Sequence, residues 1–114
     1  MPVPTGGAIA DGTYLLALST FYGSPCPSQE QDRDTWLVCG TTWQHVQEST
    51  AQGTVTVNNY NFNVNPSGSN LMLQGICGFT MTATFGYDAT PTTLTLYVSG
   101  AGTGSGRVDV YNKQ

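Results

Sequence analysis

The sequence predicts an all-β protein, an eight-stranded antiparallel up-and-down barrel. Eight short segments alternate apolar residues with Thr or other polar residues, which is the pattern of a half-buried strand. No segment has the period of a helix, and Gly, Pro, Asn and Ser turns separate the eight segments. A barrel pairs its first and last strands and so removes both exposed sheet edges. A two-sheet sandwich is the alternative for the same strands.

The chain is long enough for one domain, because 114 residues can bury a single hydrophobic core. Residues 1–11 are rich in Pro, Gly and small residues, so we expect a flexible leader there and a barrel over residues 12–114. No apolar run is long enough for a transmembrane helix. We expect an exported protein, extracellular or periplasmic. A lipid anchor in the precursor is one option, since such leaders also follow the lipid-bearing cysteine of bacterial lipoproteins.

The composition excludes two classes of partner. Charged residues make up only 9% of the chain, and the net charge is −4 with three cations. A nucleic-acid binder needs clustered cations to neutralise phosphates, and electrostatic attraction to an anionic membrane needs them too. The chain has no such cluster. The surface is expected to consist of Thr, Ser, Asn and Gly, as in secreted β proteins.

The first expected strand, 13–22, follows an Asp-Gly turn. In a regular strand Tyr14 and Leu18 would share one face. The long loop 23–34 comes next. Its acidic residues, which include Asp34, have an alternate spacing that slightly resembles a calcium loop, but the Gly hinge and the terminal Glu are missing. We therefore predict a solvated polar loop without a metal.

The next two expected strands, 35–39 and 42–49, are joined by a Gly-Thr turn. The fourth strand, 53–64, is long, and its apolar residues change face midway. One extra residue near Asn58-Asn59 would cause this change, which predicts a β-bulge there. A tight hairpin at the same two residues is the alternative.

The second half of the chain supplies four more strands. They are expected at residues 70–76, 79–87, 92–98 and 107–112. The second of these has the clearest period of two, because aromatic and other apolar residues alternate with Thr from Phe79 onward. In the last strand Val108 and Val110 are expected to point inward. A Gly/Ser-rich run, 99–106, predicts a flexible loop before it.

Several segments resemble the lipocalin-like barrels of secreted bacterial proteins. They are DGTYLL at 11–16, TWQ at 42–44, TTLTL at 92–96 and VDVY at 108–111. The Gly-x-Trp motif of lipocalins is here Gly-Thr-Tyr at 12–14, and their flanking C-terminal helix is missing. The resemblance covers nearly the whole chain and implies a calycin-type barrel with a ligand cavity. It implies no activity and no catalytic residues.

Three cysteines in an exported chain suggest one disulfide and one free thiol. In an up-and-down barrel, Cys26 in the first loop and Cys77 after the fifth strand lie at the same rim. Cys39 ends the second strand at the opposite rim, about 23 Å away, whereas bridged Cα atoms lie within about 7 Å. We therefore expect a Cys26–Cys77 bridge and a free Cys39. The spacing of the cysteines matches no zinc motif, so no metal site is predicted.

The single histidine, His45, shares a strand face with Trp43 and is expected inside the barrel. A buried histidine held by a neighbouring side chain and a histidine that contacts a ligand are both compatible with this position. Aromatic walls with a few polar tips suit an apolar or aromatic small molecule. The expected ligand-binding residues are Tyr14, Trp36, Trp43, His45, Tyr60, Phe79 and Phe85.

The function predicted first is binding of a small hydrophobic or aromatic molecule in the barrel, without a cofactor. A small metal-independent hydrolase of esters or phosphoesters is the alternative, with His45 as base and Cys39 or Cys77 as nucleophile. A two-residue turn at 40–41 would point Cys39 away from His45, and a three-residue turn would place both on one face. A third possibility is a structural surface module whose aromatic residues fill the core.

Overall fold

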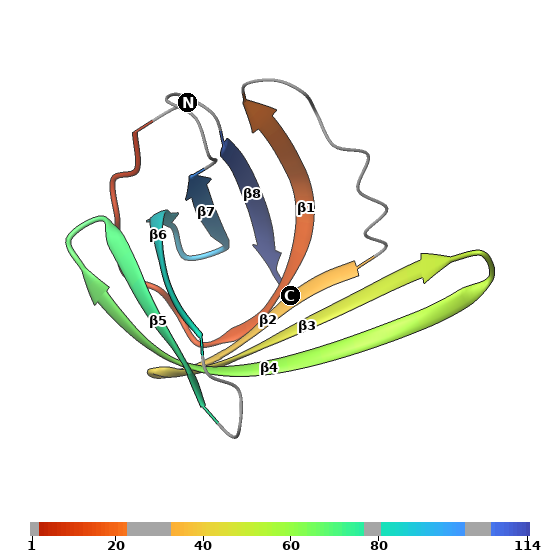
Figure 1. Cartoon of the computed structure of the whole chain (residues 1–114). Coiled ribbons are helices and arrows are strands. Elements are labelled where there is room, and N and C mark those ends of the chain that lie inside the picture. The colour runs from red at the N-terminus through yellow and green to blue at the C-terminus, as the bar shows by residue number, and fades with distance from the viewer. Residues whose placement is uncertain (1–2, 23–32, 77–80, 100–105) are drawn as a thin grey trace.

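The computed structural model describes residues 3–22, 33–76, 81–99 and 106–114. It confirms the all-β prediction, because eight antiparallel strands form one closed barrel in chain order (Figure 1). No helix is present among the described residues. The strands are β1 (Gly12–Tyr22), β2 (Arg33–Cys39), β3 (Thr42–Ala51), β4 (Thr54–Ser67), β5 (Asn70–Ile76), β6 (Thr82–Ala89), β7 (Thr93–Ser99) and β8 (Gly106–Lys113).

β1 closes the barrel against β8 and contains the irregularity of this pair. The pairing shifts between Leu16 and Leu18, so Ala17 is an extra residue. A bulge reverses the alternation of side chains beyond it. Leu18 therefore lies on the outer face, 59% exposed, and the expectation that it shares the face of Tyr14 is wrong. Ser19 faces the barrel interior instead and reaches a buried carboxylate there.

β4 runs straight through the position where a bulge was predicted. Its pairing with β3 is continuous along the whole hairpin, so both the bulge and the tight turn at Asn58-Asn59 are wrong. The apolar residues change face along a regular strand: Phe62 is in the core, whereas Val55 and Val57 are more than half exposed on the outer face. The tip of the β3–β4 hairpin extends past β2 and β5 (Figure 1). The β4 side chains from Thr54 to Asn59 are exposed there.

β8 presents polar residues to the interior. Val108 and Val110 were expected to point inward, but Arg107, Asp109 and Tyr111 line the interior cavity instead. The expectation is wrong because it ranked residues by hydropathy alone. A carboxylate is stable inside a barrel where a cation and a hydroxyl bind it, and both are present. Val108 is still buried, but on the opposite face of the strand.

One end of the barrel interior is packed with aromatic and aliphatic side chains. On β3 this core begins at Trp43, and the cavity begins at His45, two residues further along the same face. The buried core consists of Tyr14, Trp36, Val38, Trp43, Phe62, Val64, Leu71, Leu73, Tyr87, Leu94, Leu96 and Tyr111.

Residues 3–11 lie against the barrel beside β6 (Figure 1). The Gly6 amide donates to the Tyr87 carbonyl at 2.7 Å, and the Ala89 amide donates to the Gly6 carbonyl at 3.0 Å. Gly6 has φ 77°, and a Cβ atom there would lie 2.7 Å from the Gly68 carbonyl oxygen. Glycine is required at this position for both reasons.

Candidate functional site

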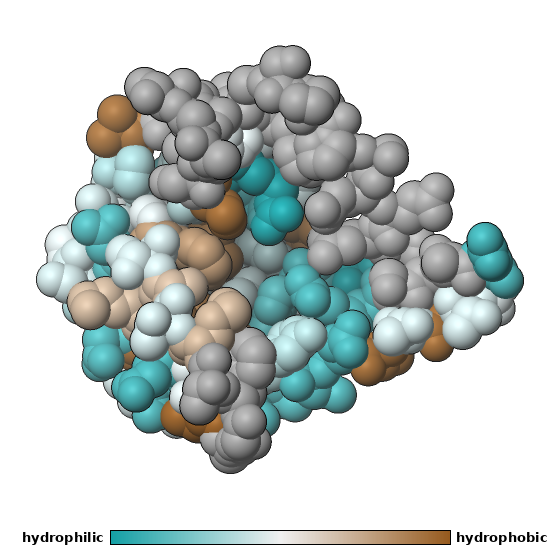
Figure 2. All heavy atoms as spheres, viewed as in Figure 1, coloured by the Kyte–Doolittle hydropathy of each residue, from teal (hydrophilic) through white to brown (hydrophobic). Residues whose placement is uncertain are grey.

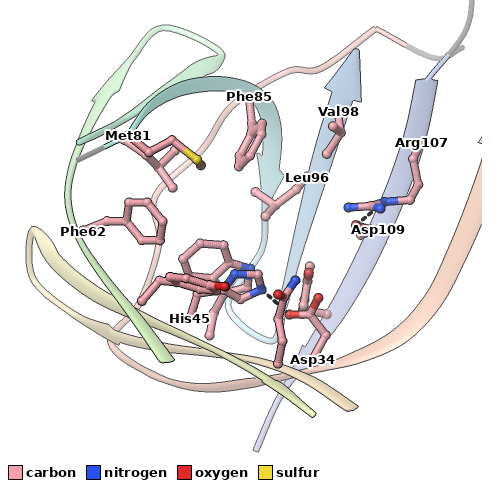
Figure 3. Close-up of a pocket in the computed structure, with 14 residues that line it drawn as sticks. Asp34, His45, Phe62, Met81, Phe85, Leu96, Val98, Arg107 and Asp109 are labelled. Carbon is pink, nitrogen blue, oxygen red and sulfur yellow. Dashed lines mark hydrogen bonds and ion pairs between the residues drawn. The ribbon is translucent and has the colours of Figure 1, made fainter. Parts of the chain in front are cut away.

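The barrel contains a cavity of about 390 Å³ (Figure 3). This volume lies within the range of small-molecule sites, roughly 300–1,000 Å³. The barrel is hollowed on the face shown in Figure 2, with hydrophobic residues largely to one side of the hollow and hydrophilic residues to the other. The lining residues are Asp34, Trp36, His45, Gln47, Tyr60, Phe62, Leu73, Met81, Phe85, Leu96, Val98, Arg107, Asp109 and Tyr111.

One side of the cavity is apolar. It is formed from β4 to β7 and the residue before β6, and the side chains of this set that Figure 3 labels surround the open space. Large apolar walls bind ligands by removing apolar surface from water, which contributes roughly 25 cal/mol per Å². The residues are Phe62, Leu73, Met81, Phe85, Leu96 and Val98.

The opposite side begins with a contact between Asp34 and His45. Asp34 Oδ1 bonds His45 Nε2, and only 3% of the Asp34 side chain is exposed. The imidazole also stacks on the Trp36 indole, with ring centroids 4.1 Å apart and planes inclined by 8°. Two fixed contacts therefore hold His45 in one orientation. The Tyr60 ring lies 6.5 Å from the imidazole and completes an aromatic corner of the cavity.

A second carboxylate, Asp109, lies beside this corner on β8. Its Oδ1 accepts a hydrogen bond from Ser19 at 2.7 Å, and its Oδ2 accepts one from Arg107 Nε at 2.8 Å. Asp109 is 2% exposed. The bulge in β1 turns Ser19 toward the interior and so contributes to this site. Figure 3 shows the Arg107 guanidinium next to Asp109 at the edge of the cavity.

The Tyr111 hydroxyl lies within the electrostatic influence of both carboxylates. Burial raises the pKa of its hydroxyl well above the usual range, and the negative charges of Asp34 and Asp109 raise it further. The hydroxyl is the polar neighbour of Trp36 Nε1. That indole nitrogen is buried, and among the described residues no acceptor meets ordinary hydrogen-bond geometry with it. The polar side of the cavity thus presents two carboxylates and one guanidinium from the described residues to a ligand.

Four of the seven predicted ligand-binding residues line the cavity: Trp36, His45, Tyr60 and Phe85. Tyr14 and Trp43 are buried in the packed end and do not line it, which corrects their predicted role. Both residues lie nearer the packed end of the barrel, so their rings fill the interior there. Phe79 lies outside the described residues.

The sequence reasoning missed the two carboxylates and Arg107. Asp34 was assigned to a solvated loop, but β2 begins at Arg33 and places Asp34 on the inner face with Trp36. The alternation of Asp34, Trp36 and Val38 is the signal that could have found it. In β8 the same alternation places Arg107, Asp109 and Tyr111 on the inner face of the strand, where all three line the cavity.

Cys39 does not meet His45. It pairs with Thr42 across a two-residue turn and is an exposed free thiol, whereas His45 faces the interior. The catalytic pair of Cys39 and His45 is therefore wrong, because the two side chains lie on opposite faces of the barrel wall. Cys26 and Cys77 lie outside the described residues, so their bridge and the role of Cys77 as a nucleophile stay predictions.

The fold and the cavity define the class of this protein as a closed eight-stranded antiparallel β-barrel with an internal cavity. No protein-family model matches the chain, and no curated protein matches it. In the part of the chain that the structure describes, no group of three His, Cys, Asp or Glu residues could hold a metal ion. No helix there is long and apolar enough to cross a membrane.

Proposed function

We propose that this protein binds a small molecule with an apolar or aromatic body inside the barrel. The observation that carries the proposal is the cavity of about 390 Å³, with an apolar wall facing a compact polar group. A structural module with a filled core would not keep such a space. Export from the cytoplasm and a lipocalin-like role are part of the proposal, and the barrel topology and the low content of charged residues support them.

Binding of a neutral apolar dye, N-phenyl-1-naphthylamine, tests the proposal. Val98→Phe places a larger side chain in the cavity wall, whereas Val57→Phe adds the same ring on the exposed outer face. We expect Val98→Phe to weaken binding roughly tenfold, since overpacking costs about 1–3 kcal/mol. Val57→Phe should bind like the parent protein. No dye binding to the parent, or equal binding by both variants, contradicts the proposal.

Hydrolysis of an ester in the same cavity is a second candidate. The contact that favours it is Asp34 with His45, because a general base works best when a carboxylate orients its imidazole. Loss of nitrophenyl-ester turnover in His45→Ala, with turnover retained in Cys39→Ser, would support it. Turnover that survives His45→Ala would exclude this mechanism.

A further inference from the structure

We propose that the cavity selects a cationic amine with an aromatic body, which binds its ammonium group beside Asp34 and its ring against the aromatic corner formed by Trp36 and Tyr60. This inference rests on the proposed function and adds the chemical class of the ligand to it.

The charges in the cavity leave a negative excess when the imidazole is neutral. Among the described lining residues, two buried carboxylates, Asp34 and Asp109, face one guanidinium, that of Arg107. A cation is attracted more strongly to a buried carboxylate such as Asp34 than to an exposed one, because water screens the buried charge less. A ligand ammonium would balance the two negative charges with two positive ones.

The two carboxylates differ in what they can still bind. Ser19 occupies one oxygen of Asp109 and Arg107 the other. At Asp34, the contact with His45 uses Oδ1, and no hydrogen bond from the described residues occupies Oδ2. Asp34 is therefore the group that an entering ammonium would meet. A ligand carboxylate would instead lie beside two like charges. The cation among the described lining residues, Arg107, is already bound to Asp109.

The aromatic corner suits a cation as well as an apolar ring. Trp36 and Tyr60 line the cavity near His45, and Figure 3 shows His45 and Asp34 on the same side of the open space. Aromatic faces attract a cation within about 6 Å of the ring centre, and the attraction grows when the site excludes water. Aromatic rings and a carboxylate together recognise an ammonium group better than either does alone.

Three ligands with the same naphthyl body test the inference by isothermal titration calorimetry of the full chain at neutral pH. They are 1-naphthylmethylamine, a cation; 1-naphthylmethanol, which is neutral; and 1-naphthaleneacetate, an anion. We expect the amine to bind at least about tenfold more tightly than the alcohol, as one additional desolvated ion pair predicts. The anion should bind most weakly. Equal affinities, or tighter binding of the alcohol or the anion, overturn the inference while leaving the proposed function intact.

Two variants assign the selectivity to Asp34. Asp34→Asn should abolish the preference for the amine over the alcohol, whereas Glu48→Gln, which removes a charge outside the cavity lining, should keep it. If Asp34→Asn does not fold, Arg107→Gln gives the complementary measurement: loss of this cation should tighten the amine and raise the ratio of amine to alcohol affinity. A preference that persists in Asp34→Asn, or an amine that Arg107→Gln weakens, contradicts the inference. Failure of all three ligands to bind overturns the proposed function along with it.

Discussion

Asp34 shows how much a single residue position decides in this barrel. Its carboxylate is 3% exposed, and it contacts the only histidine of the chain. A buried carboxylate without partners would be costly, and the His45 imidazole offsets that cost. In return Asp34 holds His45 against Trp36 and makes one wall of the cavity polar. The chemistry of the candidate site depends on this contact.

Gly6 lies too close to neighbouring backbone to accept a side chain. Gly6 and Gly68 both have a positive φ, but only at Gly6 would a Cβ atom collide with backbone, 2.7 Å from a carbonyl oxygen. Alanine in a left-handed conformation costs about 1–2 kcal/mol at either position. We expect Gly6→Ala to lower the free energy of unfolding by at least about 1 kcal/mol more than Gly68→Ala in urea titrations. Equal losses would show that the Gly6 backbone can move without cost.

At the scale of the element, β1 has the irregularity that the site uses. The bulge at Ala17 sends Leu18 outward and lets Ser19 donate to Asp109. A regular β1 would instead place Leu18 inside and leave Asp109 without its hydroxyl partner. Bulges re-aim side chains, and this one turns Ser19 toward Asp109 in the barrel interior.

A pair of leucine substitutions tests the bulge. Leu18 is 59% exposed in β1, and Leu94 is fully buried in β7. We expect Leu94→Ala to lower the free energy of unfolding by about 2–5 kcal/mol because it leaves a cavity. Leu18→Ala should change it by no more than about 0.5 kcal/mol, as exposed substitutions do. A loss at Leu18 comparable to that at Leu94 would mean that β1 is regular and that Leu18 points inward.

At the scale of the whole molecule, the N-terminal residues and β6 are joined across 83 positions of the sequence. Asp88 accepts hydrogen bonds from the amide and hydroxyl of Thr5, and it accepts another from the Tyr97 hydroxyl. Partial burial alone would raise the pKa of Asp88, but these hydrogen bonds outweigh it, and the pKa lies below the usual value.

The lowered pKa of Asp88 predicts a pH dependence of stability. A carboxylate whose pKa is lower in the folded state stabilises that state above its unfolded pKa of about 3.9. The contribution is lost as the pH falls through the lower folded pKa. We therefore expect Asp88→Asn to reduce the melting temperature at pH 7 and to have little effect once Asp88 is protonated in the parent. A reduction of equal size at acid pH would contradict the role of the charge.

The strands could be predicted from the sequence because their signals are local. Alternation with a period of two and Gly, Pro or Asn turns are visible in any short window, and all eight predicted strands are present. The candidate site could be predicted only in part. Trp36, His45, Tyr60 and Phe85 were found because aromatic rings and a lone histidine in barrel strands favour the interior.

The sequence by itself determined the class of fold, the number of strands and the low-charge surface, since each follows from composition and local pattern. Only the tertiary structure decided which polar residues lie inside. Asp109 is stable in the interior because β1 supplies Ser19 and β8 supplies Arg107, and Asp34 because β3 supplies His45. Burial of a charge depends on its partners, and Ser19 comes to Asp109 from 90 positions away in the sequence, which no short window contains.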